Sequence, residues 1–404
     1  MKILVCNTHE SKGGAAKSAR RIYECLKSNG QDVHYITYFS ETSDEDVYSP
    51  NSFVDKILRF VIPKLDYLLR IIFIKDRKVP FSASLFSSGV PRFLNSFSPD
   101  IVNLNYTNMG FLSIKDLTKI KAPIVWTLHD SWAFSGGIHL PSHSENLYPE
   151  LLNKHLLRYP KSFNISEFIF LQKKKLWRNL DITIVSPSRW LATRASQSSV
   201  FKKEHIKVIP NPINTTIFKP RDKIFSRRKL ELDLGNRYIL FGAVNGLKDS
   251  NKGFKMLLKA IKMLGNEDIK ILSFGSQESS FSDDKIIELG YIEDQEELSY
   301  IYSAADVTVL PSFSENFPNV LLESVSCGTP IVGFAVGGIP EIIKDDSIGS
   351  LAKPYEIKDL SLKIKETLYN KKFDRGTMHR GIEKEYGFEE ISNKYINLYK
   401  SILE

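Results

Sequence analysis

Short apolar runs rich in β-branched residues alternate with longer amphipathic segments along this chain, and this alternation limits its fold more than any other feature. Such runs are typical of strands buried in a parallel sheet, and the segments between them of the covering helices. We expect strands over 3–6, 33–37, 101–104, 124–128 and 182–185, and then over 238–241, 269–274, 307–310 and 331–334. The rhythm restarts once, which predicts an α/β protein of two doubly wound domains.

The boundary between the two domains is predicted near Pro210 and Pro212, because prolines remove backbone donors and interrupt both helices and central strands. A chain of 404 residues is long enough for two cores. We expect one domain over residues 1–208 and a second over 209–385. Residues 386–404 are predicted to form a terminal helix, a candidate to cross back to the first domain.

Composition narrows the class of protein. Hydrophobic residues make up 42% of the chain and charged residues 25%, as in globular proteins. No apolar run reaches the roughly 20 residues that cross a bilayer, and residues 1–7 look like a buried strand rather than a signal peptide. We therefore expect a cytoplasmic protein. Its three cysteines are too scattered for a disulfide framework.

The formal charge of +8 favours anionic partners. Residues 53–78 interleave large apolar side chains with lysines and arginines. This segment is either a basic amphipathic helix on an anionic membrane surface or a helix packed on its own domain with solvated lysines. A nucleotide is the expected anionic partner, a membrane surface is a candidate that depends on the first of these two alternatives, and nucleic acid is not expected.

The strongest chemical signal follows the strand predicted over 307–310. Glu315 precedes Pro318, which suits the start of a helix, and Glu323 lies about one and a half turns inside that helix. The unpaired amides of a first helical turn can hold a diphosphate, and carboxylates accept hydrogen bonds from sugar hydroxyls. We place these amides at Phe317, Asn319, Val320 and Leu321. The pattern fits a nucleotide sugar.

Glu315, seven intervening residues and Glu323, followed by the run 326–332, resemble the signature of retaining glycosyltransferase family 4. The likeness continues in residues 209–212, 290–292, 302–306 and 337–341, in family order. It implies the GT-B fold, in which two Rossmann-like domains face each other across a cleft. It also implies a retaining transfer from a nucleoside diphosphate sugar.

The resemblance also implies roles for single residues. Glu315 would contact the donor sugar and support the reaction centre, while Glu323 would hold the ribose hydroxyls. Tyr291 and Ile292, at the end of a strand, would contact the base through their backbone.

A second loop, over residues 241–254, carries Lys252 directly before a glycine. A lysine at such a turn is a point charge for phosphate. In similar enzymes a basic residue early in this loop and a lysine near its end both bind the diphosphate. Lys252 matches the later position. The early position has no basic match, and Lys248 is the candidate substitute.

Two loops of the first domain complete the predicted site. His129 follows the strand predicted over 124–128 and resembles a histidine that contacts the donor sugar in colanic-acid-type members of the family. A structural histidine is the alternative. Gly13 and Gly14 open the first helix, and the resemblance puts them beside the donor phosphate and the acceptor. His139 and His143 have a zinc-like spacing but lack other ligands, so no metal site is expected.

Residues 12–18 also allow a rival interpretation as the deviant phosphate loop of partition-type ATPases. Lys17 would then contact the phosphates and Ser18 would hold magnesium. Ala16 departs from that pattern, because a β-carbon obstructs the backbone wrap. A non-catalytic scaffold that keeps the fold and a nucleotide-sugar epimerase are further alternatives.

The favoured hypothesis is a retaining glycosyltransferase in surface polysaccharide biosynthesis. It would use a nucleoside diphosphate sugar as co-substrate, no other cofactor and no metal. The acceptor would be a glycan or a lipid-linked glycan, and the enzyme would act in the cytoplasm or on the inner face of the cytoplasmic membrane.

Overall fold

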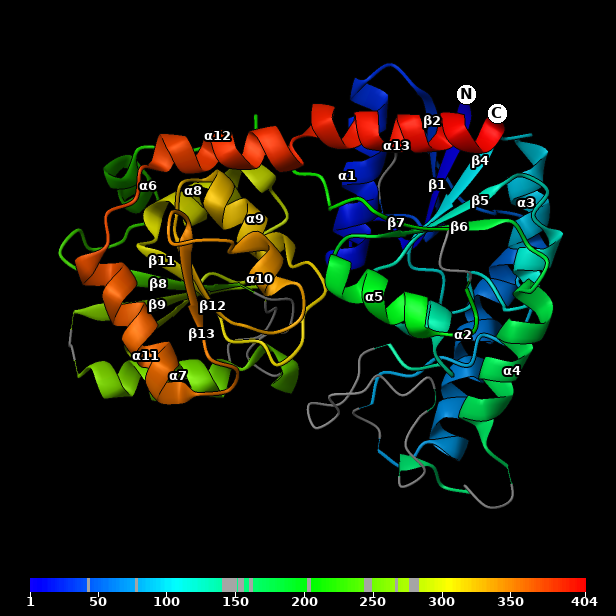
Figure 1. The fold of residues 1–404 in the computed structure, drawn as a ribbon, viewed down its shortest axis with the longest axis horizontal. Helices are drawn as coiled ribbons and strands as arrows, with labels where there is room; N and C mark the ends of the chain where they lie inside the picture. Colours follow the sequence, from blue (N-terminus) through cyan, green and yellow to red (C-terminus); the bar gives the residue numbers. More distant parts are fainter. Residues whose placement is uncertain are drawn as a thin grey trace. The chain divides into compact units, whose positions relative to one another are not determined.

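The protein is described here from a computed structural model, which covers residues 1–41, 44–76, 79–139, 151, 156–159, 163–201, 205–242, 249–265, 268–275 and 283–404. The chain divides into two compact units. Unit 1 comprises Met1–Asn211 together with Ser392–Glu404, and unit 2 comprises Pro212–Ile391. Each unit is built on one parallel sheet with helices on both faces (Figure 1). The predicted class, two doubly wound α/β units, is therefore confirmed.

The sheet of unit 1 has the strand order β3-β2-β1-β4-β5-β6-β7. Its strands are β1 Lys2–His9, β2 Asp32–Phe39, β3 Val47–Tyr48, β4 Ile101–Leu104, β5 Ile124–Thr127, β6 Ile182–Ser186 and β7 Ile206–Val208. Strand β1 pairs in parallel with β2 on one side and with β4 on the other. The direction of winding therefore reverses between β1 and β4, which is the switch point where open α/β sheets bind ligands.

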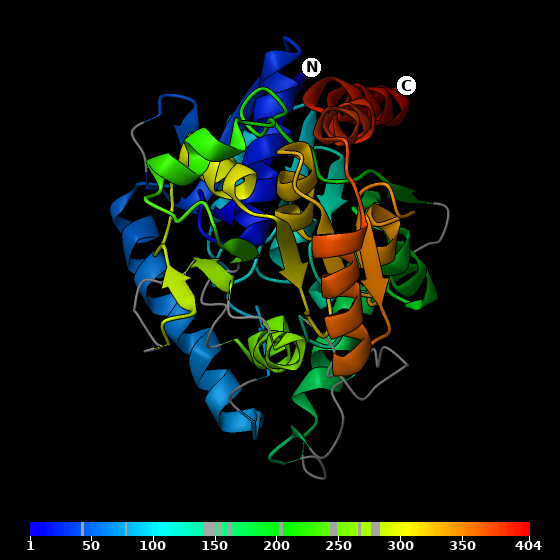
Figure 2. The same ribbon diagram turned by 90° about the vertical axis from the view of Figure 1, so that its left-hand side faces the viewer.

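Helices cover both faces of this sheet. They are α1 Gly14–Ser28, α2 Phe53–Phe73, α3 Val90–Ser96, α4 Ile165–Trp177 and α5 Arg189–Gln197, with the 3₁₀ turns η1 Asp116–Lys119 and η2 Trp132–Phe134. Because side chains alternate along a strand, Leu4, Cys6 and Trp126 join the core on one face, while Asn103 and Thr127 point to the other. Helix α2 runs along the edge of the unit in Figure 2.

The last helix, α13, covers Phe388–Leu403, and its residues from Ser392 onward belong to unit 1. Tyr395 and Tyr399 are fully buried there. The Tyr399 hydroxyl accepts a hydrogen bond from the Asn103 amide at 2.6 Å, and the Tyr395 hydroxyl lies 3.1 Å from the Thr127 hydroxyl. The C-terminal helix is thereby fixed to the middle of the first sheet by buried polar contacts.

Unit 2 has the strand order β10-β9-β8-β11-β12-β13. Its strands are β8 Arg237–Gly242, β9 Ile269–Phe274, β10 Ile286–Glu288, β11 Val307–Leu310, β12 Ile331–Phe334 and β13 Gly349–Ala352. Strand β8 pairs with both β9 and β11. The switch point of this sheet therefore lies between β8 and β11.

Helices α7 and α11 lie on one side of the second sheet, and α8, α9 and α12 lie on the other (Figure 1). The helices and helical turns of unit 2 are α6 Lys223–Lys229, η5 Ser250–Lys252, α7 Phe254–Leu264, α8 Gln295–Ala304, α9 Asn319–Ser326, α10 Ile339–Ile342, α11 Ile357–Lys365, η6 Glu366–Asn370 and α12 Arg375–Tyr386. Buried side chains of this sheet and its helices form one continuous core.

Candidate active site

Two loops that carry predicted site residues meet at the switch point of unit 2. One follows β8 and contains Lys252, and the other follows β11 and contains Glu315. The backbone of the two loops is joined directly, because the Phe313 N–H donates to the Asn251 carbonyl at 2.8 Å. The Asn251 side-chain amide donates to the Ser314 carbonyl at 3.0 Å. Sequence positions more than 60 residues apart therefore form one rigid edge of the sheet.

Lys252 and Glu315 form an ion pair, with 2.6 Å between Nζ and Oε1. Their side chains are 25% and 12% exposed, so the pair is largely withdrawn from water. Burial lowers the pKa of Lys252, but the Glu315 carboxylate raises it more, and the net pKa lies above its usual range. The amine is therefore an ammonium at neutral pH. An ammonium has three donors, so it can bind a further anionic oxygen beside the carboxylate.

Glycines position both members of this pair. Gly253 has φ +70°, and a Cβ there would lie 1.9 Å from the Pro311 carbonyl oxygen. Gly337 has φ +59°, and a Cβ there would lie 1.8 Å from the carbonyl oxygen of Glu315. The same carbonyl accepts the Gly338 N–H at 3.0 Å. Only glycine permits this approach, so the loop after β12 fixes the backbone of Glu315.

The helix after Glu315 begins slightly later than its sequence suggests. Pro318 is the N-cap of α9 and the helix starts at Asn319, so Phe317 lies outside it. The prediction of an unpaired amide at Leu321 was wrong, because this N–H donates to the Pro318 carbonyl at 3.1 Å. Tightening of the first turn into a 3₁₀-type bond explains the difference. Asn319 and Val320 are half-buried at the helix start.

Glu323 lies deeper in α9 and is only 3% exposed. The hydroxyl of Tyr302, on the neighbouring helix α8, donates to its Oε2 at 2.6 Å. This bond holds the carboxylate in one orientation. The sequence did not single out Tyr302 as a site residue, although it belongs to one of the family-like segments.

The remaining predicted residues of unit 2 lie in two other loops. Tyr291 and Ile292 follow β10 in a half-buried loop, and the carbonyl of Gly290 accepts the Gly275 N–H at 2.7 Å. This bond joins the loop to the end of β9. Lys248 lies outside the described residues.

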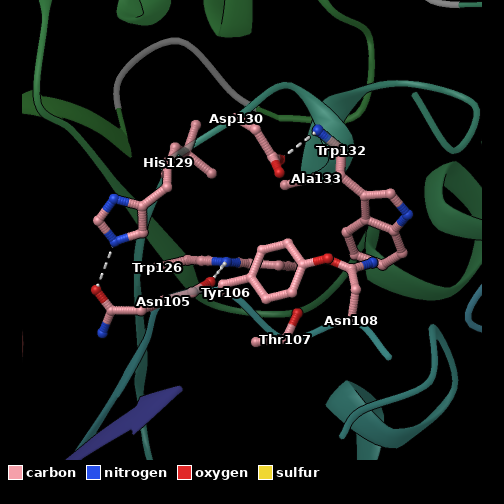
Figure 3. Close-up of a pocket in the computed structure, with 10 residues that line it drawn as sticks. Asn105, Tyr106, Thr107, Asn108, Trp126, His129, Asp130, Trp132 and Ala133 are labelled. Atoms are coloured by element: carbon pink, nitrogen blue, oxygen red, sulfur yellow. Dashed lines mark hydrogen bonds between the residues drawn. The ribbon is translucent and has the colours of Figure 1, made fainter. Parts of the chain in front are cut away.

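Unit 1 contains a pocket at the carboxyl ends of β4 and β5 (Figure 3). Polar groups of two loops and the faces of two indole rings line it. These residues are Asn105, Tyr106, Thr107, Asn108, Trp126, Leu128, His129, Asp130, Trp132 and Ala133. Its free volume of about 10 Å³ has room for about one water molecule, so the described residues do not form a preformed sugar pocket.

His129 is oriented by a chain of amides at this pocket. Its Nε2 lies 2.9 Å from Asn105 Oδ1 (Figure 3). The Asn105 amide nitrogen donates in turn to Asn103 Oδ1 at 3.2 Å. The carbonyl oxygen only accepts, so Nε2 carries the proton and Nδ1 is the ring acceptor. Burial lowers the pKa of His129 to about 4, against a smaller opposing effect of Asp130. The imidazole is therefore neutral at neutral pH.

Asp130 is held by a second chain that the sequence did not predict. Its Oδ2 lies 2.6 Å from Nδ1 of His139, whose Nε2 lies 2.9 Å from the Ser82 hydroxyl. Its Oδ1 accepts the Trp132 N–H at 2.8 Å. The fully buried Lys173 donates to backbone carbonyls of the same loop, including that of Ser135 at 2.9 Å. The sequence analysis considered His139 only as a zinc ligand, expected no metal site, and did not predict this contact with Asp130.

The loop at the start of α1 is open at both predicted glycines. Gly13 has φ +91°, and no described atom lies within 4 Å of a Cβ built on Gly13 or Gly14. A ligand can therefore approach the backbone here. The Ser18 hydroxyl is buried and donates to the Gly14 carbonyl at 3.0 Å. It points back into the helix, which disfavours the magnesium role that the ATPase hypothesis gives to Ser18.

Histidines, cysteines and carboxylates of the described residues form no group of three or more that could hold a metal ion. His143 lies outside the described residues. Within the same described ranges, no helix is both long enough and apolar enough to cross a membrane.

Comparison with known sequences identifies the family of the chain. Residues 12–217, just over half of the chain, match Glycosyltransferase Family 4, and residues 222–384 match Glycosyl transferases group 1. The chain is 32% identical over 193 residues to a D-inositol 3-phosphate glycosyltransferase of Arthrobacter sp. (strain FB24). That stretch covers 44% of this chain and 45% of the relative, so the chain spans less than half the length of the relative it matches.

Solved structures share the fold over the whole chain. Sucrose-phosphate synthase of Thermosynechococcus elongatus has a TM-score of 0.69 at 19% identity. The match covers 100% of this chain and 99% of the synthase chain. Anabaena HepE in complex with UDP-glucose has a TM-score of 0.67 at 15% identity and covers 99% of this chain and 100% of its own.

The two parallel sheets and the structural neighbours show the GT-B fold, and the two family matches show a glycosyltransferase. The chain belongs to glycosyltransferase family 4, as the signature around Glu315 and Glu323 predicted. The predicted fold, family and enzyme class are confirmed.

Proposed function

We propose that this glycosyltransferase transfers a sugar from a nucleoside diphosphate sugar to a hydroxyl of a glycan or lipid-linked glycan, with retention of the anomeric configuration. The ion pair of Lys252 and Glu315 at the switch point of unit 2 carries the proposal. It puts a fixed cation and a sugar-binding carboxylate at the place where open α/β sheets bind nucleotides. The complex of HepE with UDP-glucose supports a uridine donor.

In this proposal, unit 2 binds the donor. The bond between the anomeric carbon and the diphosphate breaks, and negative charge develops on the departing phosphate oxygen. The Lys252 ammonium and the amides at the start of α9 stabilise that charge, which makes a metal ion unnecessary. Glu315 contacts the sugar hydroxyls, and Glu323, oriented by Tyr302, accepts the ribose hydroxyls. Tyr291 and Ile292 contact the base.

Unit 1 supplies the remaining groups. Gly13 and Gly14 let a ligand approach the start of α1, and neutral His129 contacts the donor sugar through one ring nitrogen. Asp130, held in place by His139, lies next to His129 and contacts the hydroxyl-bearing substrate. The relative's name, D-inositol 3-phosphate glycosyltransferase, is consistent with an acceptor that offers hydroxyl groups. We place the reaction in surface polysaccharide biosynthesis, in the cytoplasm or at the cytoplasmic face of a membrane.

A donor screen tests the proposal. The full chain is incubated with a panel of UDP- and GDP-sugars and a membrane extract, and the products are read by mass spectrometry with release of nucleoside diphosphate. One donor should give an acceptor-dependent product, and Lys252→Ala and Glu315→Ala should abolish it.

Other outcomes would replace the proposal. ATP hydrolysis that Lys17→Ala abolishes would support the ATPase hypothesis. Donor isomerisation without an acceptor would indicate an epimerase. Absence of both turnover and donor binding would indicate a scaffold.

A further inference from the structure

Helix α2, all of whose residues 53–73 are described, turns charged side chains toward its own unit. Only Ile62 and Asp66 of this helix are buried. Asp66 accepts the backbone N–H of Ser84 at 2.6 Å. Arg59 donates to the Pro50 carbonyl, and its guanidinium lies 5.3 Å from the centre of the Tyr38 ring. Polar contacts therefore help to hold this helix in place, beside the buried Ile62 and the packing of Leu69 and Phe73 against the core.

Most of the other large apolar side chains of α2 face outward. At 100° per residue, Phe53, Ile57 and Phe60 lie on the side opposite Ile62 and Asp66. The exposed apolar residues of the helix are Phe53 (78%), Val54 (60%), Ile57 (47%), Phe60 (66%), Val61 (38%), Tyr67 (54%), Leu68 (49%) and Ile72 (39%). We call this stripe the outer face of α2. Apolar stripes of this length in water mark a surface that is covered by a partner.

The charges of the helix are divided between its two sides. Both of its carboxylates are used inward, Asp55 in the capping box with Ser52 and Asp66 on Ser84. Lys64 stands on the outer face, with its ammonium 3.3 Å from the centre of the Phe60 ring. Lys56, also exposed, lies at its edge. The outer face is therefore mainly apolar, and the charged side chains on it and at its edge are lysines.

A second group of exposed apolar side chains lies at the start of α4, apart from the outer face. The ring of Phe73, in the last turn of α2, lies 5.4 Å from that of Phe163. Phe163 is 42% exposed and contacts Phe168, which is 36% exposed, and Leu171 of the same helix is 53% exposed. At 100° per residue, Phe73 lies on the side of Ile62 and Asp66, so this group is separate from the outer face.

We propose that the outer face of α2 docks on the surface of an anionic lipid bilayer. Aromatic and aliphatic side chains enter the interface while lysine ammonium groups stay at the level of the headgroups. A second copy of the chain fits less well, because a two-fold contact centred on this face would bring Lys64 against its own copy. The docking specifies the membrane location included in the proposed function, but it does not depend on glycosyl transfer.

Vesicle co-sedimentation tests the docking. The full chain is mixed with vesicles of phosphatidylcholine, with and without phosphatidylglycerol, at two salt concentrations. It should bind the anionic vesicles about tenfold more tightly than the neutral ones, and salt should weaken this binding. The double variant Phe53→Ser with Phe60→Ser should lose at least about tenfold in vesicle affinity. Lys64→Glu should lose about tenfold on anionic vesicles only.

Matched controls separate the docking surface from general effects. Met263→Ser with Leu362→Ser removes two exposed apolar side chains of unit 2, and Lys358→Glu inverts an exposed charge there. None of these should change vesicle binding. Because Phe53 and Phe60 are exposed, the thermal midpoint of their variant should stay unchanged, and so should UDP binding.

Three results would overturn the proposal. They are absence of binding to anionic vesicles, binding that survives Phe53→Ser with Phe60→Ser, and a dimer in analytical ultracentrifugation that this variant dissociates. The last would assign the outer face to a second copy. Loss of donor turnover with intact vesicle binding would contradict only the proposed function.

Discussion

Replacing Glu315 by glutamine is expected to strengthen the binding of UDP while it abolishes sugar transfer. In the free enzyme the carboxylate neutralises Lys252, the cation proposed for the diphosphate. Glutamine keeps the size of the side chain and removes its charge. The diphosphate then no longer competes with a carboxylate for the ammonium.

The size of the effect follows from the geometry of the pair. At 2.6 Å and an effective dielectric constant of about 20, the Coulomb energy is about 6 kcal/mol. Desolvation and solvent contact reduce the net interaction energy to about 1.5–3 kcal/mol, the range found for hydrogen bonds to charged groups. Lys252 can bind both partners at once, so only part of this is recovered, and we expect UDP to bind about threefold to tenfold more tightly.

Calorimetric titration of UDP measures this change, with the donor reaction measured in parallel. Glu366→Gln is the matched control, because it removes the carboxylate of another ion pair of unit 2, with Lys363 at 3.0 Å. It should leave UDP affinity unchanged. Equal or weaker UDP binding by Glu315→Gln would refute the reasoning, since the carboxylate would then not compete for Lys252.

Three further outcomes are expected. Gly337→Ala should lower both transfer activity and the thermal midpoint because its Cβ meets the Glu315 carbonyl, whereas Gly265→Ala, with a similar positive φ and no described atom near its Cβ, should cost about 1 kcal/mol and no activity. The pKa of His129 lies near 4 when folded and near 6.5 when unfolded, so stability should be lost as pH falls from about 6.5 to 4; His129→Asn should remove up to about 3 kcal/mol of that loss, measured by denaturant unfolding. Tyr399→Phe should cost about 1–3 kcal/mol of unfolding free energy, because a buried amide loses its acceptor, and an unchanged stability would contradict this.

Most of the fold could be predicted from the sequence, because buried parallel strands are written as apolar runs. The strands over 101–104, 269–274, 307–310 and 331–334 have the predicted bounds. The strands β3, β7, β10 and β13 were not predicted. The first three have only two or three residues, and β13 contains few β-branched side chains, so none of them forms a distinct apolar run.

The candidate site was only partly predictable. Motif positions pointed to Glu315, Glu323 and Lys252, but not to the direct contact between Lys252 and Glu315. That contact depends on β8 and β11 being neighbours, and strand order is a tertiary property. Knowing that two loops flank a switch point would have suggested it.

The contacts behind the site gave even less sequence signal. Tyr302 donates to Glu323 from the neighbouring helix α8. His139 contacts Asp130 from nine positions further along the chain. The sequence also did not show which side of α2 is exposed. Its composition predicts an amphipathic helix, but only tertiary packing decides which side is buried.

A crystal structure of the chain with UDP tests the central claim most directly. The account predicts an oxygen of the β-phosphate within about 2.7–3.2 Å of Lys252 Nζ, beside the first turn of α9 and with Glu315 still in contact with the ammonium. A diphosphate bound elsewhere, with no contact to Lys252, would contradict it.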